Sequence, residues 1–179
     1  GLFPSHLGPL VQGCDYSCAT AGLGEVWETP RVAVKPFPSC HFTHAFADAA
    51  IALHRSGVDL GRITRIRALI ARESVKTVCE PLANKQRPSN DYDSKFSVPF
   101  AIAAGLVHGR FGLNEHEDAC RTDPRILALA EKVQYEIDPG TGFPRHYSGE
   151  VIVQLDDGRE LRHREQVNRG CADRPLSNE

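Results

Sequence analysis

The residues best suited to chemistry gather between positions 35 and 44 of the sequence. Lys35 is followed by two prolines and then by a Cys-His-x-x-His cluster, formed by Cys40, His41 and His44. An ammonium group can bind a carboxylate or stabilise an enolate, and an imidazole can exchange protons near neutral pH. Because the free N–H groups at the start of a helix favour anions, this stretch indicates a site for an anionic substrate.

Each of these residues also has a simpler structural interpretation. A lysine at the end of a strand usually lies in solvent. A histidine near the start of a helix more often packs against its neighbours than acts as a base. Cys40 can serve as a small, buried apolar side chain. From position alone, the structural interpretation is favoured for Lys35, His41 and His44.

The local pattern around the cluster predicts the elements that position it. Residues 30–37 form the first expected strand. An alanine-rich helix then runs from Thr43 or His44 to about Arg55, and Gly57 ends it. Lys35 therefore lies near the end of a strand, and the histidines lie at the start of a helix.

Further along the chain, stretches in which apolar and polar residues alternate predict strands, and stretches in which apolar residues recur at helical spacing predict helices. The expected strands cover residues 62–71, 134–138, 150–155 and 159–167, the last two joined into a hairpin by Asp156-Asp157-Gly158. The expected helices cover residues 91–108, in spite of Pro99, and a stretch from Asp123-Pro124 to about Val133. Residues 81–90 are polar, carry two prolines and predict a loop.

This order of elements indicates an α+β fold. We expect a two-layer sandwich in which helices cover one face of a mainly antiparallel sheet. The length of 179 residues suits a single domain over positions 1–179. Residues 1–28, rich in glycine, proline and small polar residues, are expected to form a peripheral leading segment, and residues 168–179 a peripheral tail.

Composition narrows the classes of function. Apolar residues make up 41% of the chain, which permits a core, and no apolar run approaches the length of a membrane span. The net charge of −2 and the lack of a basic block argue against nucleic acid as a partner, and we expect no membrane partner. The six cysteines are irregularly spaced, which favours reduced thiols and a cytoplasmic protein. The chain contains no methionine, so we expect that Gly1 is not a native start.

Three stretches resemble the MmgE/PrpD family, whose members include 2-methylcitrate dehydratase, cis-aconitate decarboxylase and iminodisuccinate epimerase. They are Val-Lys-Pro-Phe-Pro-Ser-Cys-His-Phe-Thr-His from Val34, the segment 93–112, and Phe-Pro-Arg-His-Tyr-Ser-Gly-Glu-Val from Phe143 together with the Val-Asn-Arg-Gly near the end. The resemblance covers nearly the whole chain, in the family's order.

The resemblance implies a cofactor-independent lyase or isomerase that acts on small di- or tricarboxylates. The reaction would be dehydration, decarboxylation or epimerisation through removal of a proton next to a carboxylate, without metal or organic cofactor. Family members are two to three times longer and carry a helical domain before this α+β domain, with the active site between the two. We therefore expect a C-terminal domain fragment that is inactive alone. Its expected partners are the substrate, the missing helical domain and a second copy in a homodimer.

The resemblance also assigns roles to residues. Lys35 matches the family's active-site lysine in the Lys-x-Phe-Pro pattern, and His44 matches a histidine that follows threonine. Decarboxylase members carry a catalytic histidine where this chain has Cys40, so His41 is the candidate substitute. The candidate catalytic residues are Lys35, His41 and His44. The candidate substrate-binding residues are Lys35, Cys40 and Lys95, the last of these near the start of the 91–108 helix.

Two residues differ from the pattern of the decarboxylase members, so the resemblance does not decide which reaction is catalysed. Cys40 stands in place of the decarboxylase histidine, and Val98 stands where decarboxylase members place an active-site tyrosine. Dehydratase members lack the Cys-His-x-x-His cluster after Phe-Pro. The sequence therefore names neither the substrate nor the general base.

Two other classes of function compete with the enzyme. In the first, Cys14, Cys18, Cys40, His41 and His44 form a zinc-binding domain, although the Cys14–Cys18 spacing is wider than that of structural zinc sites. In the second, the apolar helix around residues 100–107 and the hairpin form a non-catalytic dimerisation or interaction surface. The family resemblance ranks the enzyme above both.

Overall fold

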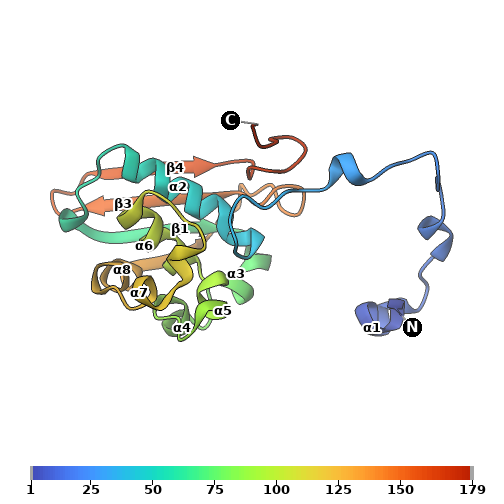
Figure 1. Ribbon diagram of the computed structural model, residues 1–179, viewed down its shortest axis with the longest axis horizontal. Coiled ribbons are helices and arrows are strands. Elements are labelled where there is room, and N and C mark those ends of the chain that lie inside the picture. The colour runs from blue at the N-terminus through green and yellow to red at the C-terminus, as the bar shows by residue number, and fades with distance from the viewer. Residues whose placement is uncertain (1, 178–179) are drawn as a thin grey trace. The chain divides into compact units, whose positions relative to one another are not determined.

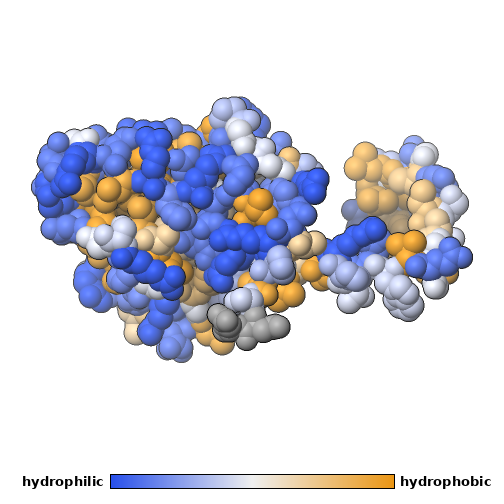
Figure 2. Space-filling model, turned by 90° about the horizontal axis from the view of Figure 1, so that it is seen from above, coloured by the Kyte–Doolittle hydropathy of each residue, from blue (hydrophilic) through white to orange (hydrophobic). Residues whose placement is uncertain are grey.

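The computed structural model describes residues 2–177 and divides the chain into two compact units, residues 1–32 and 33–179 (Figure 1). The first unit contains the short helix α1 (Leu2–Leu7) and three one-turn 3-10 helices. None of the helices described in this unit contains a buried residue. Figure 2 shows apolar side chains gathered on part of its surface. The large apolar side chains of this unit that are exposed include Leu10, Leu23 and Trp27.

The second unit is built on a four-stranded sheet with the order β2-β1-β3-β4. The strands are β1 (Ile63–Ile70), β2 (Val133–Ile137), β3 (Gly149–Leu155) and β4 (Glu160–Glu165). The β1–β2 pair is parallel, whereas β1–β3 and β3–β4 are antiparallel. The α+β class and the mainly antiparallel sheet predicted from the sequence are therefore confirmed.

Two helices form the centre of the layer on the sheet. The helix α2 (His44–Arg55) packs on β3 and β4, and α6 (Val98–His108) packs against α2 (Figure 1). A Cβ atom at Gly105 would lie 2.8 Å from the Cβ of Ala50, so glycine allows the two helices to approach closely. Every residue of α6 from Val98 to Leu106 is buried, which fits its uniformly small or apolar sequence.

Smaller helices complete the layer around α6. They are α3 (Arg72–Val78), α4 (Leu82–Gln86), α5 (Asp91–Lys95), α7 (Asp118–Arg121) and α8 (Pro124–Ala130). Over the part of the chain that the structure describes, no helix has both the length and the apolar character that crossing a bilayer requires.

Most of the expected elements are confirmed. The helix from His44 to Arg55, the strand at 62–71, the strand at 134–138 and the hairpin all lie within one or two residues of their predicted bounds. The helix opened by Asp123-Pro124 is also present, with the Asp123 carboxylate accepting a hydrogen bond from the Arg125 N–H, but it ends at Ala130.

Three predictions of local structure are wrong. Residues 30–37 do not join the sheet; Thr29–Arg31 form a 3-10 turn, and the prolines of this stretch lack the N–H groups that a sheet strand donates. The expected loop at 81–90 contains α4. The expected helix at 91–108 is two helices, because Ser97 caps α6 by accepting the N–H of Phe100, and Pro99 fits only in that first turn.

Candidate active site

Lys35 lies at the start of a bent segment without regular secondary structure, and hydrogen bonds hold this segment at both ends. The N–H of Val34 donates to the carbonyl of Gly170 at 2.8 Å. The Nζ of Lys35 donates to the carbonyl of Ser39 at 3.1 Å, so the segment from Lys35 to Ser39 folds back on itself. Phe37 points into the core and is 7% exposed, whereas Lys35 is exposed. The segment therefore holds an accessible ammonium group at a defined place.

An open cavity of about 690 Å³ lies beside this segment. Its lining includes Lys35, Cys40 and Lys95, which are the three candidate substrate-binding residues, and it is completed by apolar side chains such as Phe96 and Leu113. The N–H of Cys40 donates to the carbonyl of Lys95 at 2.8 Å, which fixes α5 against the segment. Two ammonium groups thus share one cavity although they are 60 residues apart in the sequence.

The two lysines of the cavity differ in their partners. The Nζ of Lys95 lies 2.8 Å from the Asp91 carboxylate, one turn earlier on α5. Lys35 has only a carbonyl partner, that of Ser39, among the described residues. A carboxylate ligand would therefore meet an ammonium group at Lys35 that no acidic side chain neutralises.

Cys40 contributes a thiol rather than a charge. Burial raises the pKa of the Cys40 thiol, and the N–H of Phe42 and the charge of Lys35 only partly oppose this. The thiolate is the nucleophilic form, so at neutral pH Cys40 is a polarizable, weakly polar wall of the cavity.

His41 and His44 do not line this cavity. Their rings lie against each other, with centroids 4.7 Å apart, and His41 also meets the edge of the Tyr147 ring at 5.0 Å. His41 is half-buried, and burial, followed by the charge of Lys35, lowers its pKa. His41 is therefore neutral at physiological pH.

His44 is fully buried at the start of α2. Its Nε2 faces the carbonyl of Ser39 at 3.3 Å, so Nε2 carries the ring proton, and its Nδ1 has no partner. Burial lowers the pKa of His44 to about 3, and the nearby His41 acts in the same direction. In this conformation the ring packs edge-on against Phe37, under the segment that presents Lys35.

We expect the free energy of unfolding to decrease as the pH is lowered, because His44 must stay neutral in the folded protein. Its folded-state pKa of about 3 lies below the ordinary value of 6.5. The unfolded chain therefore binds the proton first, and each pH unit below about 6.5 removes up to about 1.4 kcal/mol of unfolding free energy. Urea unfolding from pH 7 to 5 measures this slope. His44→Gln should reduce this slope but not abolish it, because burial also lowers the pKa of His116 to about 4, whereas His6→Gln, at an exposed position, should leave it unchanged. An NMR titration of His44 near pH 6.5 would contradict the prediction.

Sequence reasoning missed several polar residues near the cavity. The buried hydroxyls of Ser39 and Thr43 lie 2.8 Å apart and brace the turn before α2. The buried Ser94 donates to the carbonyl of Asp91 and lies 2.8 Å from Nδ1 of His116. Nothing in local spacing relates Ser94 to His116, 22 residues later, so no sequence signal could have paired them.

A second cavity, of about 640 Å³, adjoins the first across Phe37 and Leu113. Its charged groups are mostly paired with one another. Arg169 makes a two-pronged contact with Asp48, and Arg174 pairs with Glu165. We interpret this cavity as structural, because the Arg169–Asp48 ion pair along it joins α2 to the residues after β4.

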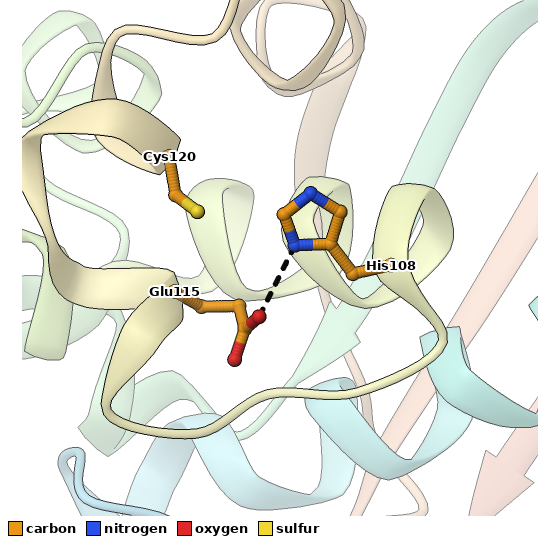
Figure 3. Close-up of side chains that lie close together, drawn as sticks. All are labelled: His108, Glu115 and Cys120. Carbon is orange, nitrogen blue, oxygen red and sulfur yellow. Dashed lines mark hydrogen bonds and ion pairs between the residues drawn. The ribbon is translucent and has the colours of Figure 1, made fainter.

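The loop between the cavities is held by Glu115, which lies beside His108 and Cys120 (Figure 3). One ligand atom from each of the three lies within 4.8 Å of the others, a spacing that a metal ion could use. However, the Glu115 carboxylate, 1% exposed, already accepts hydrogen bonds from Gly112, His108 and Arg110. Because the Arg110 guanidinium supplies the positive charge, the cluster is explained as a clamp on the loop.

Of the five candidate zinc ligands, Cys14 and Cys18 belong to the first unit, and Cys40, His41 and His44 belong to the second. All six cysteines of the chain are free thiols in the structure.

The fold and the cavity define a class: an α+β domain with an open cavity lined by two lysines. The profile of the MmgE/PrpD C-terminal domain matches residues 37–179. The chain belongs to the MmgE/PrpD family, as its sequence motifs indicated. The match begins two residues after Lys35.

Curated relatives carry enzyme names. The chain is 26% identical to mouse cis-aconitate decarboxylase over 155 residues, which is 83% of this chain and 30% of the relative. It is 27% identical to the mitochondrial 2-methylcitrate dehydratase of Yarrowia lipolytica over 132 residues, 70% of this chain and 25% of the relative. Human cis-aconitate decarboxylase is 26% identical over 155 residues, 83% of this chain and 31% of the relative. The chain thus spans less than a third of each relative's length.

Proposed function

We propose that this chain forms the C-terminal part of a cofactor-independent lyase or isomerase that acts on small di- or tricarboxylates. The observation that carries the proposal is the cavity in which Lys35 and Lys95 meet beside Cys40. The relatives' names, a decarboxylase and a dehydratase, support a substrate with several carboxylates. The reaction is dehydration, decarboxylation or epimerisation.

Lys35 carries the main electrostatic role in this proposal. Removal of a proton or of CO₂ next to a carboxylate leaves negative charge on the remaining acid, and a fixed ammonium group lowers the energy of that state. The bond to Ser39 holds the Lys35 ammonium in position before substrate arrives. Lys95, already paired with Asp91, orients a second carboxylate at the other side of the cavity.

The rest of the active site comes from outside this chain. His44 is buried, with its Nε2 proton directed at a carbonyl, and Cys40 is a thiol. We propose that the general base belongs to a helical domain of the full-length protein that covers the open cavity, so that residues 1–179 alone are inactive. The exposed apolar residues of the first unit favour association with such a partner or with a second copy in a homodimer. Six free thiols fit a reducing, cytoplasmic setting.

Exchange of the substrate α-proton with solvent tests the proposal. The full-length protein is incubated in D₂O with 2-methylcitrate, citrate, cis-aconitate or iminodisuccinate, and NMR follows deuterium uptake and product. We expect exchange or turnover with at least one of these compounds, and none with residues 1–179 alone. No exchange with any of the four would rule out the substrate class while leaving the family membership intact.

A further inference from the structure

Asn168 is a buried residue that connects the end of the sheet to the histidine cluster. It follows β4 by three residues and is 3% exposed. Its side chain reaches His41, 127 residues earlier in the chain, and the backbone of Tyr147. A buried amide must satisfy its own hydrogen bonds, so these two contacts determine how it is oriented.

The contact with Tyr147 identifies the two ends of the amide. The backbone N–H of Tyr147 lies 2.9 Å from Oδ1 of Asn168, and because an N–H can only donate, the oxygen must face it. The NH₂ group of Asn168 is therefore the end that lies 3.1 Å from Nε2 of His41. An amide nitrogen only donates, so Nε2 of His41 accepts and carries no proton.

The remaining nitrogen of His41 then has a defined state. In a neutral imidazole the single ring proton must sit on Nδ1 when Nε2 is an acceptor. Among the described residues, Nδ1 of His41 has no hydrogen-bond partner. It is not one of the unpaired polar atoms that are fully buried, so it is accessible. The ring thus presents an N–H donor, not a lone pair, at its accessible edge.

We propose that Asn168 is a positioning residue that holds His41 as a neutral Nδ1–H hydrogen-bond donor, so that His41 does not act as a general base. This inference rests on the structure alone for the tautomer and on the proposed function only where activity is measured. It changes the role that the sequence indicated for His41, because the one nitrogen that could accept a proton is occupied by Asn168.

The residues after Asn168 support a positioning role. Arg169 pairs with Asp48 on α2 at 2.8 Å, and Gly170 accepts the N–H of Val34 at 2.8 Å. Three consecutive residues therefore hold the ring of His41, the helix that follows it and the segment that presents Lys35. A displacement of this stretch would move both candidate groups together.

Nitrogen NMR of histidine tests the tautomer directly. The full-length protein is labelled with ¹⁵N-histidine at neutral pH without substrate, and His41→Gln assigns the His41 signals among the eight histidines of this chain. We expect an unprotonated Nε2 and a protonated Nδ1. The reverse pattern, or a doubly protonated ring, would overturn the inference whatever the enzyme does with substrate.

Asn168→Asp keeps the shape of the side chain but replaces the NH₂ donor that faces His41 with a carboxylate oxygen, which can only accept. A carboxylate can still accept the N–H of Tyr147 but can only accept from His41, so Nε2 should gain the proton. We expect kcat/KM to fall about 10- to 100-fold, because the reversed tautomer withdraws the N–H donor that the ring presents at its accessible edge. The change of tautomer is read by the same NMR measurement.

Gln134→Glu is the matched control. It makes the same amide-to-carboxylate change on the exposed face of β2, where Arg65 already donates to it, and should leave the His41 signals and kinetics unchanged. Unaltered kinetics in a folded Asn168→Asp would refute the positioning role even with the expected wild-type tautomer. If the wild-type enzyme turns over none of the polycarboxylates, the proposed function fails, and the wild-type NMR pattern still decides the tautomer.

Discussion

Lys35→Ala is expected to lower kcat of the full-length enzyme by about 100- to 1,000-fold, the range found when a fixed donor to a developing oxyanion is removed. Among the described residues, Lys35 is the cavity lysine without an acidic partner, and its tether to Ser39 fixes it before substrate binds. In the proposed mechanism, loss of the Lys35 ammonium removes the cation that stabilises the negative charge of the intermediate. Single-turnover kinetics and α-proton exchange in D₂O measure the effect.

Two further variants separate this role from simple charge loss. Lys76→Ala removes an exposed ammonium on α3, away from the cavity, and should leave kcat unchanged. Lys35→Arg keeps the charge but not the compact point donor, so it should recover only part of the activity. Full activity in a folded Lys35→Ala protein would move the electrostatic role to Lys95 or to residues outside this chain.

Phe46→Ala is expected to destabilise the second unit by about 3–5 kcal/mol, the usual cost of truncating a buried phenylalanine. The Phe46 ring is 0% exposed and lies directly under β3, where a Cβ atom at Gly149 would come within 2.8 Å of it. Gly149, the strand residue above the ring, has no side chain that could fill the space. Urea unfolding of the chain at pH 7 measures the loss.

Tyr92→Ala is the control for this measurement. Tyr92 is also aromatic but is 66% exposed, so its truncation should change stability by less than about 0.5 kcal/mol. A loss below about 1 kcal/mol for Phe46→Ala would mean that the core relaxes around the missing ring, and that the close approach of β3 to α2 is not required.

The parts of the fold predicted from sequence are those in which local pattern and tertiary burial agree. The helix that begins at His44 is rich in alanine and mostly buried, and Val151, Val153 and Leu155, which alternate along the first strand of the hairpin, are all buried. The parallel pairing of β1 with β2 could not be read in this way. It depends on a crossover of about 60 residues that local periodicity does not encode.

The errors have a common physical origin. Val32 and Val34 alternate like strand residues, but the prolines around them lack the N–H groups that a sheet strand donates, and Val34 makes a single bond to Gly170 instead. Likewise, the helix expected over 91–108 is interrupted because Ser97 is a better cap than a helix interior residue. In both cases one side chain or one proline outweighs the average preference of its neighbours.

Part of the candidate site could be expected from the sequence. The motif around Lys35 was visible, and Lys35, Cys40 and Lys95, the residues expected to bind substrate, line one cavity; their role in binding stays a prediction. The partner of His41 was not visible, because Asn168 is distant in sequence and lies in the stretch expected to be a peripheral tail. A contact between residues so far apart is set by topology and not by spacing.

The bond between Val34 and Gly170 has an evolutionary consequence. Val34 and Gly170 lie near the two ends of the second unit and are hydrogen-bonded to each other. The 137 residues from Val34 to Gly170 therefore start and finish at neighbouring points. A body of this kind can be inserted into another polypeptide, or exchanged between polypeptides, without stretching the host chain. Lys35 lies beside that entry point, so any host that receives the insertion has its own surface placed next to the Lys35 ammonium group. New substrate preferences could then arise from changes in the host chain alone.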